Sequence, residues 1–244
     1  MSYLFIHDGK DREYLLAPGE TLETDLGVLD VPDDVTPGDT VETHLDEPFA
    51  VRELRGPDLF NHLERTGAPM MPRDIGLVVG TTGVQSGDRV LDAGTGTGVL
   101  ATYLARMGAT VTTYEKDADF ADIARENTVL AGVEDTVTVQ TGDVTDDLDT
   151  LDQAAFDVIT LDTGDAATVV EHAPDLLVPG GFVAVYSPFV EQAREALTTA
   201  REVGLGDAET LETIQREMDI SDRGSRPSTR GVGHTGYLTF ARKP

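Results

Sequence analysis

A glycine-rich turn between a predicted strand and a predicted helix is the feature that most constrains this fold. Residues 92–98 read Asp-Ala-Gly-Thr-Gly-Thr-Gly. The apolar residues before this turn predict a buried strand, and the residues after it place Leu100, Leu104 and Met107 at helical spacing. Glycines that open a helix let a ligand approach the backbone without Cβ clashes, close to the helix N-terminus. The turn therefore predicts an α/β fold with a ligand site at a strand-to-helix junction.

The spacing of the glycines narrows the class of ligand. Gly94, Gly96 and Gly98 form G-x-G-x-G, whereas a dinucleotide-binding turn has G-x-G-x-x-G and would carry its third glycine in place of Val99. A G-x-G-x-G turn directly after an acid is typical of methyltransferases that use S-adenosylmethionine (SAM). We therefore predict a Rossmann-like SAM-dependent methyltransferase domain, with cofactor-binding residues Asp92, Gly94, Thr95, Gly96, Thr97 and Gly98.

Three further acids follow predicted strands. The second strand ends in Glu115, about 20 residues after Gly94, the offset at which an acid meets ribose hydroxyls in nucleotide-binding βαβ units. Asp143 follows the third strand, where SAM enzymes place an acid near the adenine amino group, and Asp162 ends the fourth strand. In a chain with 45 Asp and Glu, each acid alone also fits a solvated turn. The glycine turn and the β-α-β order together favour a cofactor role for Glu115, Asp143 and Asp162.

The first 66 residues differ in pattern from the rest. Short alternating runs separated by Gly, Pro and Asp turns predict a small antiparallel barrel or sandwich. A connecting helix over 56–65 follows, and the turn residues 66–69 mark a boundary. We therefore predict a small N-terminal β domain over 1–66 and a methyltransferase domain over 67–244. The predicted strands of the first domain are 3–6, 13–16, 27–31, 40–44 and 48–52.

After Asp162 the pattern continues with alternating helices and strands. Arg223, Arg226 and Arg230 lie among Gly, Ser and Pro in residues 219–232, which we interpret as a solvated hairpin tip. The last two strands are expected to pair antiparallel at one sheet edge. The predicted elements are helix 166–177, a turn at 179–181 into strand 182–186, a helix from 187 to about 203, and strands 209–214 and 235–242.

The net charge of −27 indicates the kind of solvent in which the protein is folded. Only three residues are lysine, and the 45 acids are spread along the whole sequence, as in proteins from a salt-saturated cytoplasm. Such acidity argues against a nucleic-acid partner, but in molar salt counterion release contributes little to RNA binding. There is no cysteine, no apolar run near the ~20 residues of a membrane span, and no histidine cluster. We expect a cytoplasmic, halophilic protein without a metal site or membrane anchor.

Segments along nearly the whole chain resemble the tRNA (adenine-58-N1)-methyltransferases, especially the archaeal form that also acts on adenine 57. Residues 90–98 are similar to the glycine motif of that family, and Met-Pro-Arg-Asp at 71–74 resembles its Tyr-Pro-Lys-Asp segment. Residues 186–192 resemble its Tyr-x-Pro-x-x-x-Gln segment. Arg226-Pro227, followed by residues 233–242, resembles its C-terminal signature.

The resemblance implies transfer of a methyl group from SAM to N1 of an adenine in the T-loop of tRNA, at position 58 and possibly also at 57. It implies a homotetramer, although nothing in the composition tests that. Asp162 is the implied catalytic carboxylate, close to the amino group of the target base. The implied substrate-binding residues are Arg73, Tyr186, Gln192, Arg226 and His234.

The sequence also departs from the family pattern. Asp162 is followed by Thr163-Gly164-Asp165, where the family carries Pro-Trp or a similar pair, and the chain has no Trp. Two alternatives therefore stay open. One is a SAM-dependent methyltransferase that acts on protein, such as the isoaspartate type, or on a small molecule; the N-terminal β domain argues against it. The other is a non-catalytic tRNA-binding subunit, which the intact glycine turn disfavours.

Overall fold

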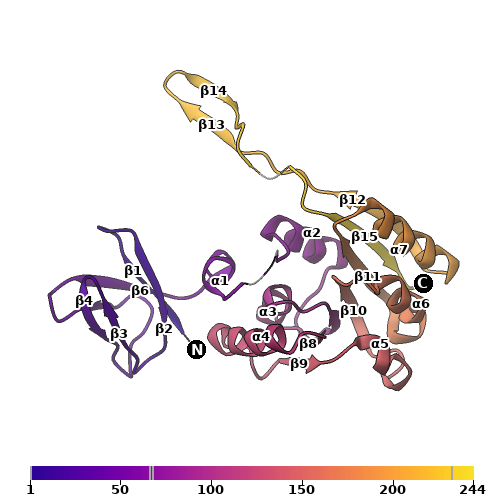
Figure 1. Cartoon of the computed structure of the whole chain (residues 1–244), viewed down its shortest axis with the longest axis horizontal. Helices are drawn as coiled ribbons and strands as arrows, with labels where there is room; N and C mark the ends of the chain where they lie inside the picture. The colour runs from indigo at the N-terminus through magenta and orange to yellow at the C-terminus, as the bar shows by residue number, and fades with distance from the viewer. Residues whose placement is uncertain (1, 66, 68, 232) are drawn as a thin grey trace.

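The computed structural model describes residues 2–65, 67, 69–231 and 233–244 of the chain. Figure 1 shows an elongated molecule with a small β unit at one end and a larger α/β unit at the other. A hairpin, β13 (Met218–Ser221) and β14 (Gly224–Pro227), extends away from the α/β unit. Within the described ranges, no helix has the length and apolar character that crossing a bilayer requires.

The larger unit is built on a seven-stranded sheet with the order β12-β15-β11-β10-β7-β8-β9. Five adjacent strands are parallel, and β15 runs antiparallel to both of its neighbours. The chain enters the sheet at β7, adds β8 and β9 on one side, and then crosses to β10 on the other side. Ligands of such sheets bind where the strand order reverses, at the carboxyl ends of the strands. The strands are β7 (Arg89–Ala93), β8 (Thr110–Glu115), β9 (Val137–Thr141), β10 (Phe156–Leu161), β11 (Leu177–Ser187), β12 (Gly206–Glu212) and β15 (Tyr237–Arg242).

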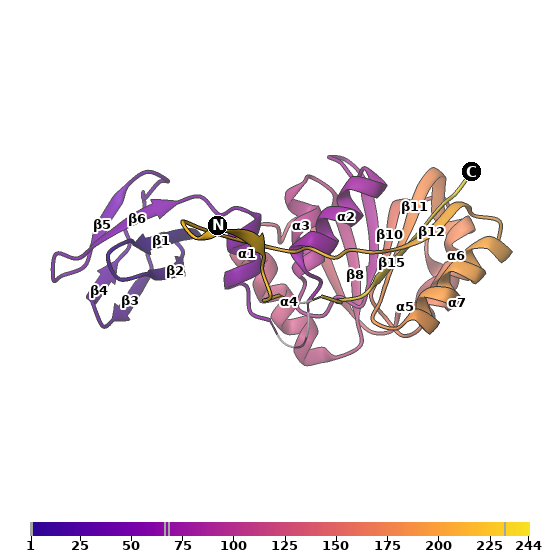
Figure 2. The same cartoon turned by 90° about the horizontal axis from the view of Figure 1, so that it is seen from above.

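Helices cover both faces of this sheet (Figure 2). Successive strand residues point to opposite faces, so Val90 packs with the α3 side while Leu91 packs with the α6 side. The predicted Rossmann-like fold is confirmed, including the antiparallel pairing of the last two strands. The helices are α2 (Pro72–Thr82), α3 (Val99–Arg106), α4 (Ala118–Ala131), α5 (Val144–Asp147), the 3-10 turn η1 (Leu148–Thr150), α6 (Ala166–Leu176) and α7 (Val190–Glu202).

The N-terminal unit is antiparallel, as its alternating sequence predicts. It contains a four-stranded sheet of order β2-β1-β6-β5 and a separate β3-β4 hairpin, which enclose a core around Phe5, Leu29 and Phe49. The first strand of that hairpin, β3, has no counterpart in the prediction. Its strands are β1 (Tyr3–His7), β2 (Arg12–Leu16), β3 (Thr21–Thr24), β4 (Gly27–Asp30), β5 (Thr40–Glu42) and β6 (Pro48–Arg52).

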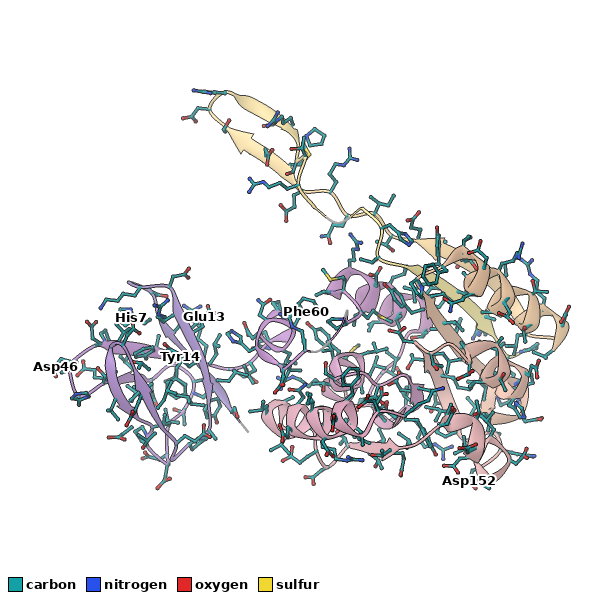
Figure 3. The ribbon with its side chains drawn as sticks, in the orientation of Figure 1. His7, Glu13, Tyr14, Asp46, Phe60 and Asp152 are labelled. Carbon is teal, nitrogen blue, oxygen red and sulfur yellow. The ribbon has the colours of Figure 1, made fainter. Side chains whose placement is uncertain are left out.

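The short helix α1 (Gly56–His62) connects the two units and contacts both. His62 Nε2 lies 3.0 Å from Glu13 Oε2 on β2, and Figure 3 marks Glu13 and Phe60 on the two sides of this junction. On the other side, Arg106 Nη2 donates to the carbonyl oxygen of Leu54 at 2.8 Å. Leu59 packs in one cluster with residues of α3. The connecting helix is therefore docked against the α/β unit.

Four predicted details differ from the structure. Met107 is not part of the buried helix face: it is the C-cap of α3 and 40% exposed, because the helix ends one residue earlier. The turn at 179–181 lies inside the long strand β11, and α7 begins at Val190, after the extended N-cap residue Phe189. Residues 219–232, interpreted from the sequence as a hairpin tip, contain most of a hairpin with two paired strands of its own, β13 and β14. Thr66 and Ala68 of the predicted boundary, and Val232, lie outside the described residues.

Candidate active site

A pocket of about 400 Å³ opens at the carboxyl ends of β7, β8, β9 and β10. This is the edge at which the sequence places the four strand-end acids, and the structure brings all four into the pocket wall. The glycine turn after β7 forms its floor. The predicted cofactor residues in the wall are Asp92, Gly94, Thr95, Gly96, Thr97, Glu115, Asp143 and Asp162; Gly98 caps α3 directly behind them.

Two glycines of the turn are required by close contacts. Gly94 has a φ of 85°, and a Cβ placed there would lie 2.0 Å from the carbonyl oxygen of Asp162. Gly98 has a φ of 78°, and its Cβ would lie 3.2 Å from that of Ala124 on α4. Gly96 has nothing within 4 Å of a Cβ position, so its backbone is open toward the pocket. The turn therefore fits tightly against β10 and α4 while leaving one side clear for a ligand.

Asp92 holds the central strands together. Its carboxylate is buried, and its two oxygens accept hydrogen bonds from Thr113 at 2.6 Å on β8 and from Thr160 at 2.5 Å on β10. Burial raises the pKa of Asp92, and the two hydroxyls oppose that rise. Thr95 reaches the same cluster, with its hydroxyl 2.5 Å from that of Thr113. These bonds set the position of the turn relative to both neighbouring strands.

Glu115 is oriented by the glycine turn itself. Its Oε2 accepts a hydrogen bond from the backbone N–H of Gly96 at 2.7 Å, and its Oε1 accepts one from Asp117 at 3.0 Å. Each oxygen keeps a further lone pair for a ligand hydroxyl. The carboxylate thus stands at the second strand end in the place expected for a ribose contact.

Asp143 is anchored by a lysine that the sequence analysis missed. Its Oδ1 accepts from the N–H and hydroxyl of Thr145 at 2.9 and 2.7 Å, which lowers the pKa of Asp143 to about 2, and Lys116 adds to that shift. Lys116 Nζ lies 2.9 Å from Asp143 and 2.5 Å from Asp165, and these carboxylates raise the pKa of Lys116. The scarcity of lysine in this chain, with one placed directly after a strand-end acid, was the signal for it.

Asp162 differs from the other three acids. Its carboxylate accepts no hydrogen bond within the part of the chain that the structure describes, whereas those of Asp92, Glu115 and Asp143 are all engaged. Burial, followed by repulsion from Asp92 and Glu115, raises the pKa of Asp162 to about 7. Among the four, Asp162 is the one whose carboxylate has no hydrogen-bond partner in the described part of the chain and whose pKa is strongly raised.

A polar network lies next to the pocket, where the first turn of α2 meets the segment before β15. Arg73 Nη2 donates to Thr235 Oγ1 at 3.0 Å, and Thr235 Oγ1 donates to Asp74 Oδ2 at 2.8 Å. Burial raises the pKa of Asp74, which is 1% exposed. A Cβ on Gly236 would lie 2.5 Å from the ring of Tyr186, so the aromatic ring is seated directly on this glycine. The network therefore joins segments more than 150 residues apart.

The other predicted substrate residues are distributed unevenly. His234 Nδ1 lies 2.7 Å from Glu212 Oε1, which raises the pKa of His234, and its Nε2 faces the carbonyl oxygen of Pro188. Gln192 on α7 has a buried Oε1 that finds no partner among the described residues. Arg226 is not brought to this site: it lies on the extended hairpin, 3.7 Å from Asp219 (Figure 1).

The apolar wall of the pocket was also missed. Met70 and Leu100 line one side, and Phe120 and Val144 line the side near Glu115 and Asp143. Phe120 and Val144 each follow a strand-end acid within a few residues, which is a usable signal. Gly67 and Pro69 line the pocket too, although their turn-forming character suggested only a boundary.

Comparison with known proteins identifies the family. A family model described as the tRNA methyltransferase complex GCD14 subunit matches residues 57–225. The tRNA (adenine(57)-N(1)/adenine(58)-N(1))-methyltransferase TrmI of Methanocaldococcus jannaschii is 34% identical over 270 residues, which span 100% of this chain and 95% of that protein. The chain belongs to this tRNA methyltransferase family.

A second curated relative agrees with this assignment, and two solved structures share the fold. The tRNA (adenine(58)-N(1))-methyltransferase TrmI of Thermus thermophilus is 29% identical, over 98% of this chain and 96% of that protein. A crystal structure of a SAM-dependent O-methyltransferase from Thermotoga maritima superposes with a TM-score of 0.78 at 26% identity, covering 99% of this chain and 92% of the other. The TrmI structure from Aquifex aeolicus shares the fold, with a TM-score of 0.76 at 22% identity and coverage of 100% and 97%.

As a member of this family the chain is a SAM-dependent methyltransferase, and its pocket fits that cofactor. The volume lies in the range of small-molecule sites, with apolar walls and a few convergent polar groups. Thr97 is 3% exposed, and its hydroxyl in the pocket wall finds no partner within the described ranges. Together with the open backbone at Gly96, that hydroxyl offers the kind of polar contact that a bound nucleoside with an amino-acid tail needs.

Proposed function

We propose that this chain transfers the methyl group of SAM to N1 of adenine 58 in the T-loop of tRNA, with adenine 57 as a second target. The observation that carries the proposal is the unengaged carboxylate of Asp162 in the pocket of a chain that matches the M. jannaschii enzyme along its whole length. That relative is named for both adenines, which favours the two-site activity over the single-site one.

Each cofactor residue has a distinct proposed role. Glu115 accepts hydrogen bonds from the ribose hydroxyls, and Asp143, held in place by Thr145 and Lys116, accepts one from the adenine amino group. Thr97 presents its hydroxyl to the amino-acid tail, and Gly94, Thr95 and Gly96 present their backbone, while Gly98 acts from behind as the cap of α3. Asp92 acts indirectly, by fixing the turn against its two neighbouring strands.

Asp162 is the proposed catalytic carboxylate. SAM, when bound, supplies a methyl group on a sulfonium centre whose sulfur leaves with the electron pair of the broken bond. The lone pair of adenine N1 forms the new bond, so no base is needed to activate the nucleophile. Positive charge develops on the adenine ring, and a carboxylate that accepts a hydrogen bond from its N6 amino group stabilises the transition state more than the ground state. With a pKa near 7, Asp162 can also accept a proton at neutral pH.

The target base must leave the folded T-loop to reach this carboxylate, at a cost of a few kcal/mol. Tyr186 is the proposed stacking partner, because its ring is fixed on Gly236 and its hydroxyl lies in the field of both Asp74 and Asp162. Arg73, Gln192 and His234 are the further proposed RNA contacts. Arg226 and its hairpin extend away from the pocket, so any contact with tRNA there is remote from the reacting base.

Methylation of tRNA transcripts tests the proposed substrate. The protein, kept in molar KCl, is incubated with SAM and transcripts in which adenine 57, adenine 58 or both are replaced, and stops in reverse transcription are mapped. We expect each replacement to remove the stop at its own position and the double replacement to abolish methylation. Methylation of the doubly replaced transcript, or of an isoaspartyl peptide instead of RNA, would contradict the assignment.

We also propose the archaeal subtype, a halophilic source and a homotetramer. The net charge of −27 with three lysines supports a cytoplasm rich in salt, because screening makes uniform acidity tolerable. Thermal unfolding as a function of KCl concentration tests the halophilic source. The free energy of unfolding should rise steeply up to molar KCl. Light scattering in the same buffers measures the assembly, and a monomer would reject the tetramer.

A further inference from the structure

The connecting segment between the two units, of which the structure describes Glu64, Arg65, Gly67, Pro69 and Met70, forms part of the cofactor pocket. Gly67, Pro69 and Met70 contribute to its wall together with the strand-end acids. Met70 is 6% exposed and packs with Val99, the first residue of the helix that follows the glycine turn. The pocket is therefore bounded on one side by the α/β unit and on another by the chain that leads out of the N-terminal sheet.

One buried side chain holds this segment against the glycine turn. Asn127 lies on α4 and is fully buried. Its amide nitrogen donates to the carbonyl oxygens of Glu64 and of Thr97, at 2.8 Å each, and its amide oxygen accepts from the N–H of Glu64 at 3.0 Å. Both donor hydrogens of the side chain are thus used on backbone carbonyls that belong to two different segments.

The location of Asn127 leaves little room for these segments to shift independently. Ala124, one helical turn earlier on α4, is the residue against which Gly98 is packed. Glu64 is fixed at one end of the connecting segment and Met70 at the other, with Gly67 and Pro69 between them in the pocket wall. A displacement of the amide would move the carbonyl of Thr97 and the start of the connecting segment together.

We propose that Asn127 is a positioning residue for the cofactor site, which couples the connecting segment of the N-terminal unit to the glycine turn. The affinity for SAM then depends on the side-chain amide of Asn127, which does not itself line the pocket. Docking of the connecting segment against the α/β unit and binding of SAM then favour each other. By linkage the coupling is reciprocal: SAM binding also tightens the attachment of the connecting segment. This inference rests on SAM as the cofactor and is independent of the identity of the methyl acceptor.

Calorimetry of SAM binding to matched variants tests the proposal. Asn127→Asp keeps the size of the side chain but removes both donors, and Asn127→Ala removes the group. Because a buried carbonyl left without its donor is costly, we expect the Kd for SAM to rise about tenfold or more in both, with kcat at saturating SAM within about threefold of wild type. For Asn127→Asp, lowering the pH toward 5 should recover part of the affinity, because a protonated carboxyl donates one hydrogen bond.

Arg106→Met is the matched control. Arg106 also ties the units together, because it donates to the carbonyl oxygen of Leu54 while its second hydrogen bond goes to Ala131 on α4, but it lies outside the pocket wall. We expect it to lower the melting temperature while leaving the Kd for SAM within twofold. Wild-type affinity in the Asn127 variants, or an equal loss in Arg106→Met, would overturn the proposal.

Hydrogen exchange on the wild-type protein keeps the proposal testable if the Asn127 variants do not fold. Saturating SAM should slow exchange of the Glu64 amide, and an unchanged rate would refute the coupling. A wild-type protein that binds SAM but fails to methylate transcripts would reject the proposed substrate and leave this inference standing.

Discussion

Replacement of Asp162 by Asn should stabilise the protein and inactivate it. Asp162 has a folded-state pKa of about 7, raised above its ordinary value of 3.8 by burial and by the charges of Asp92 and Glu115. The folded state therefore binds more protons than the unfolded state between these two values, and wild-type stability falls as the pH rises through that window. Below pH 3.8 the carboxyl is neutral in both states, and the cost disappears.

The size of the effect follows from the shift. One pKa unit corresponds to about 1.4 kcal/mol, so ionised Asp162 costs the folded state about 4 kcal/mol above pH 7. The amide of asparagine and the protonated carboxyl of aspartic acid are both neutral and both desolvated at this position, so their burial costs nearly cancel. We expect a net stabilisation of about 4 kcal/mol at pH 8, equivalent to about 8–16 °C in melting temperature for a chain of this size.

Calorimetric unfolding of Asp162→Asn and wild type in molar KCl, from pH 4 to pH 9, measures this difference. The gap in melting temperature should be small at pH 4, widen toward pH 7 and then level off. Methyl transfer should fall by a factor of about 100 or more at pH 8, with SAM affinity within a few-fold, since the lost group acts on charge that develops in the transition state. Equal stability at pH 8, or a difference that does not change with pH, would refute the burial argument.

Two further substitutions separate cofactor binding from target positioning. Glu115→Gln should weaken SAM binding about tenfold by calorimetry, because the ribose contact loses its charge; the exposed Glu134→Gln serves as the control, and equal affinities would exclude the ribose role. Thr235→Val removes the donor to Asp74 and the acceptor for Arg73, so kcat on tRNA should fall about tenfold with SAM affinity unchanged, while Thr235→Ser restores activity. If kcat of Thr235→Ser were as low as that of Thr235→Val, the hydroxyl would not be the group that supports activity.

Local sequence patterns were sufficient to place the strand ends. The glycine turn and the acids Glu115, Asp143 and Asp162 all follow short runs rich in β-branched residues, which predict strands, and all of them except Gly98 lie in the pocket wall. Parallel strands joined by helices bring such residues to one edge whatever the strand order. For this reason the fold and most of the cofactor site could be derived without knowledge of any tertiary contact.

Contacts that depend on strand order or on distant segments could not be derived in this way. The role of Asp92 follows from Thr113 and Thr160, which flank it only because β8 and β10 are both neighbours of β7. Gly67 and Pro69 have the composition of a simple linker, and their place in the pocket wall depends on how the chain between the two units packs against the glycine turn. Exposure of Met107 shows the same limit, because the helical period continues past the point where the helix ends.

The four acids of the pocket differ in their hydrogen bonds. Under the proposed mechanism, this difference accounts for both the binding of the cationic cofactor and the release of its uncharged-sulfur product. Asp92, Glu115 and Asp143 are held in fixed orientations by hydroxyls, backbone amides and Lys116. Asp162 has no such partner within the described residues, and its pKa near 7 reflects repulsion from two of them as well as burial. A cationic cofactor relieves that repulsion, and loss of the sulfonium charge on transfer restores it. In the mechanism proposed above, the carboxylate that stabilises the charged adenine would therefore also disfavour retention of the spent, less positively charged cofactor.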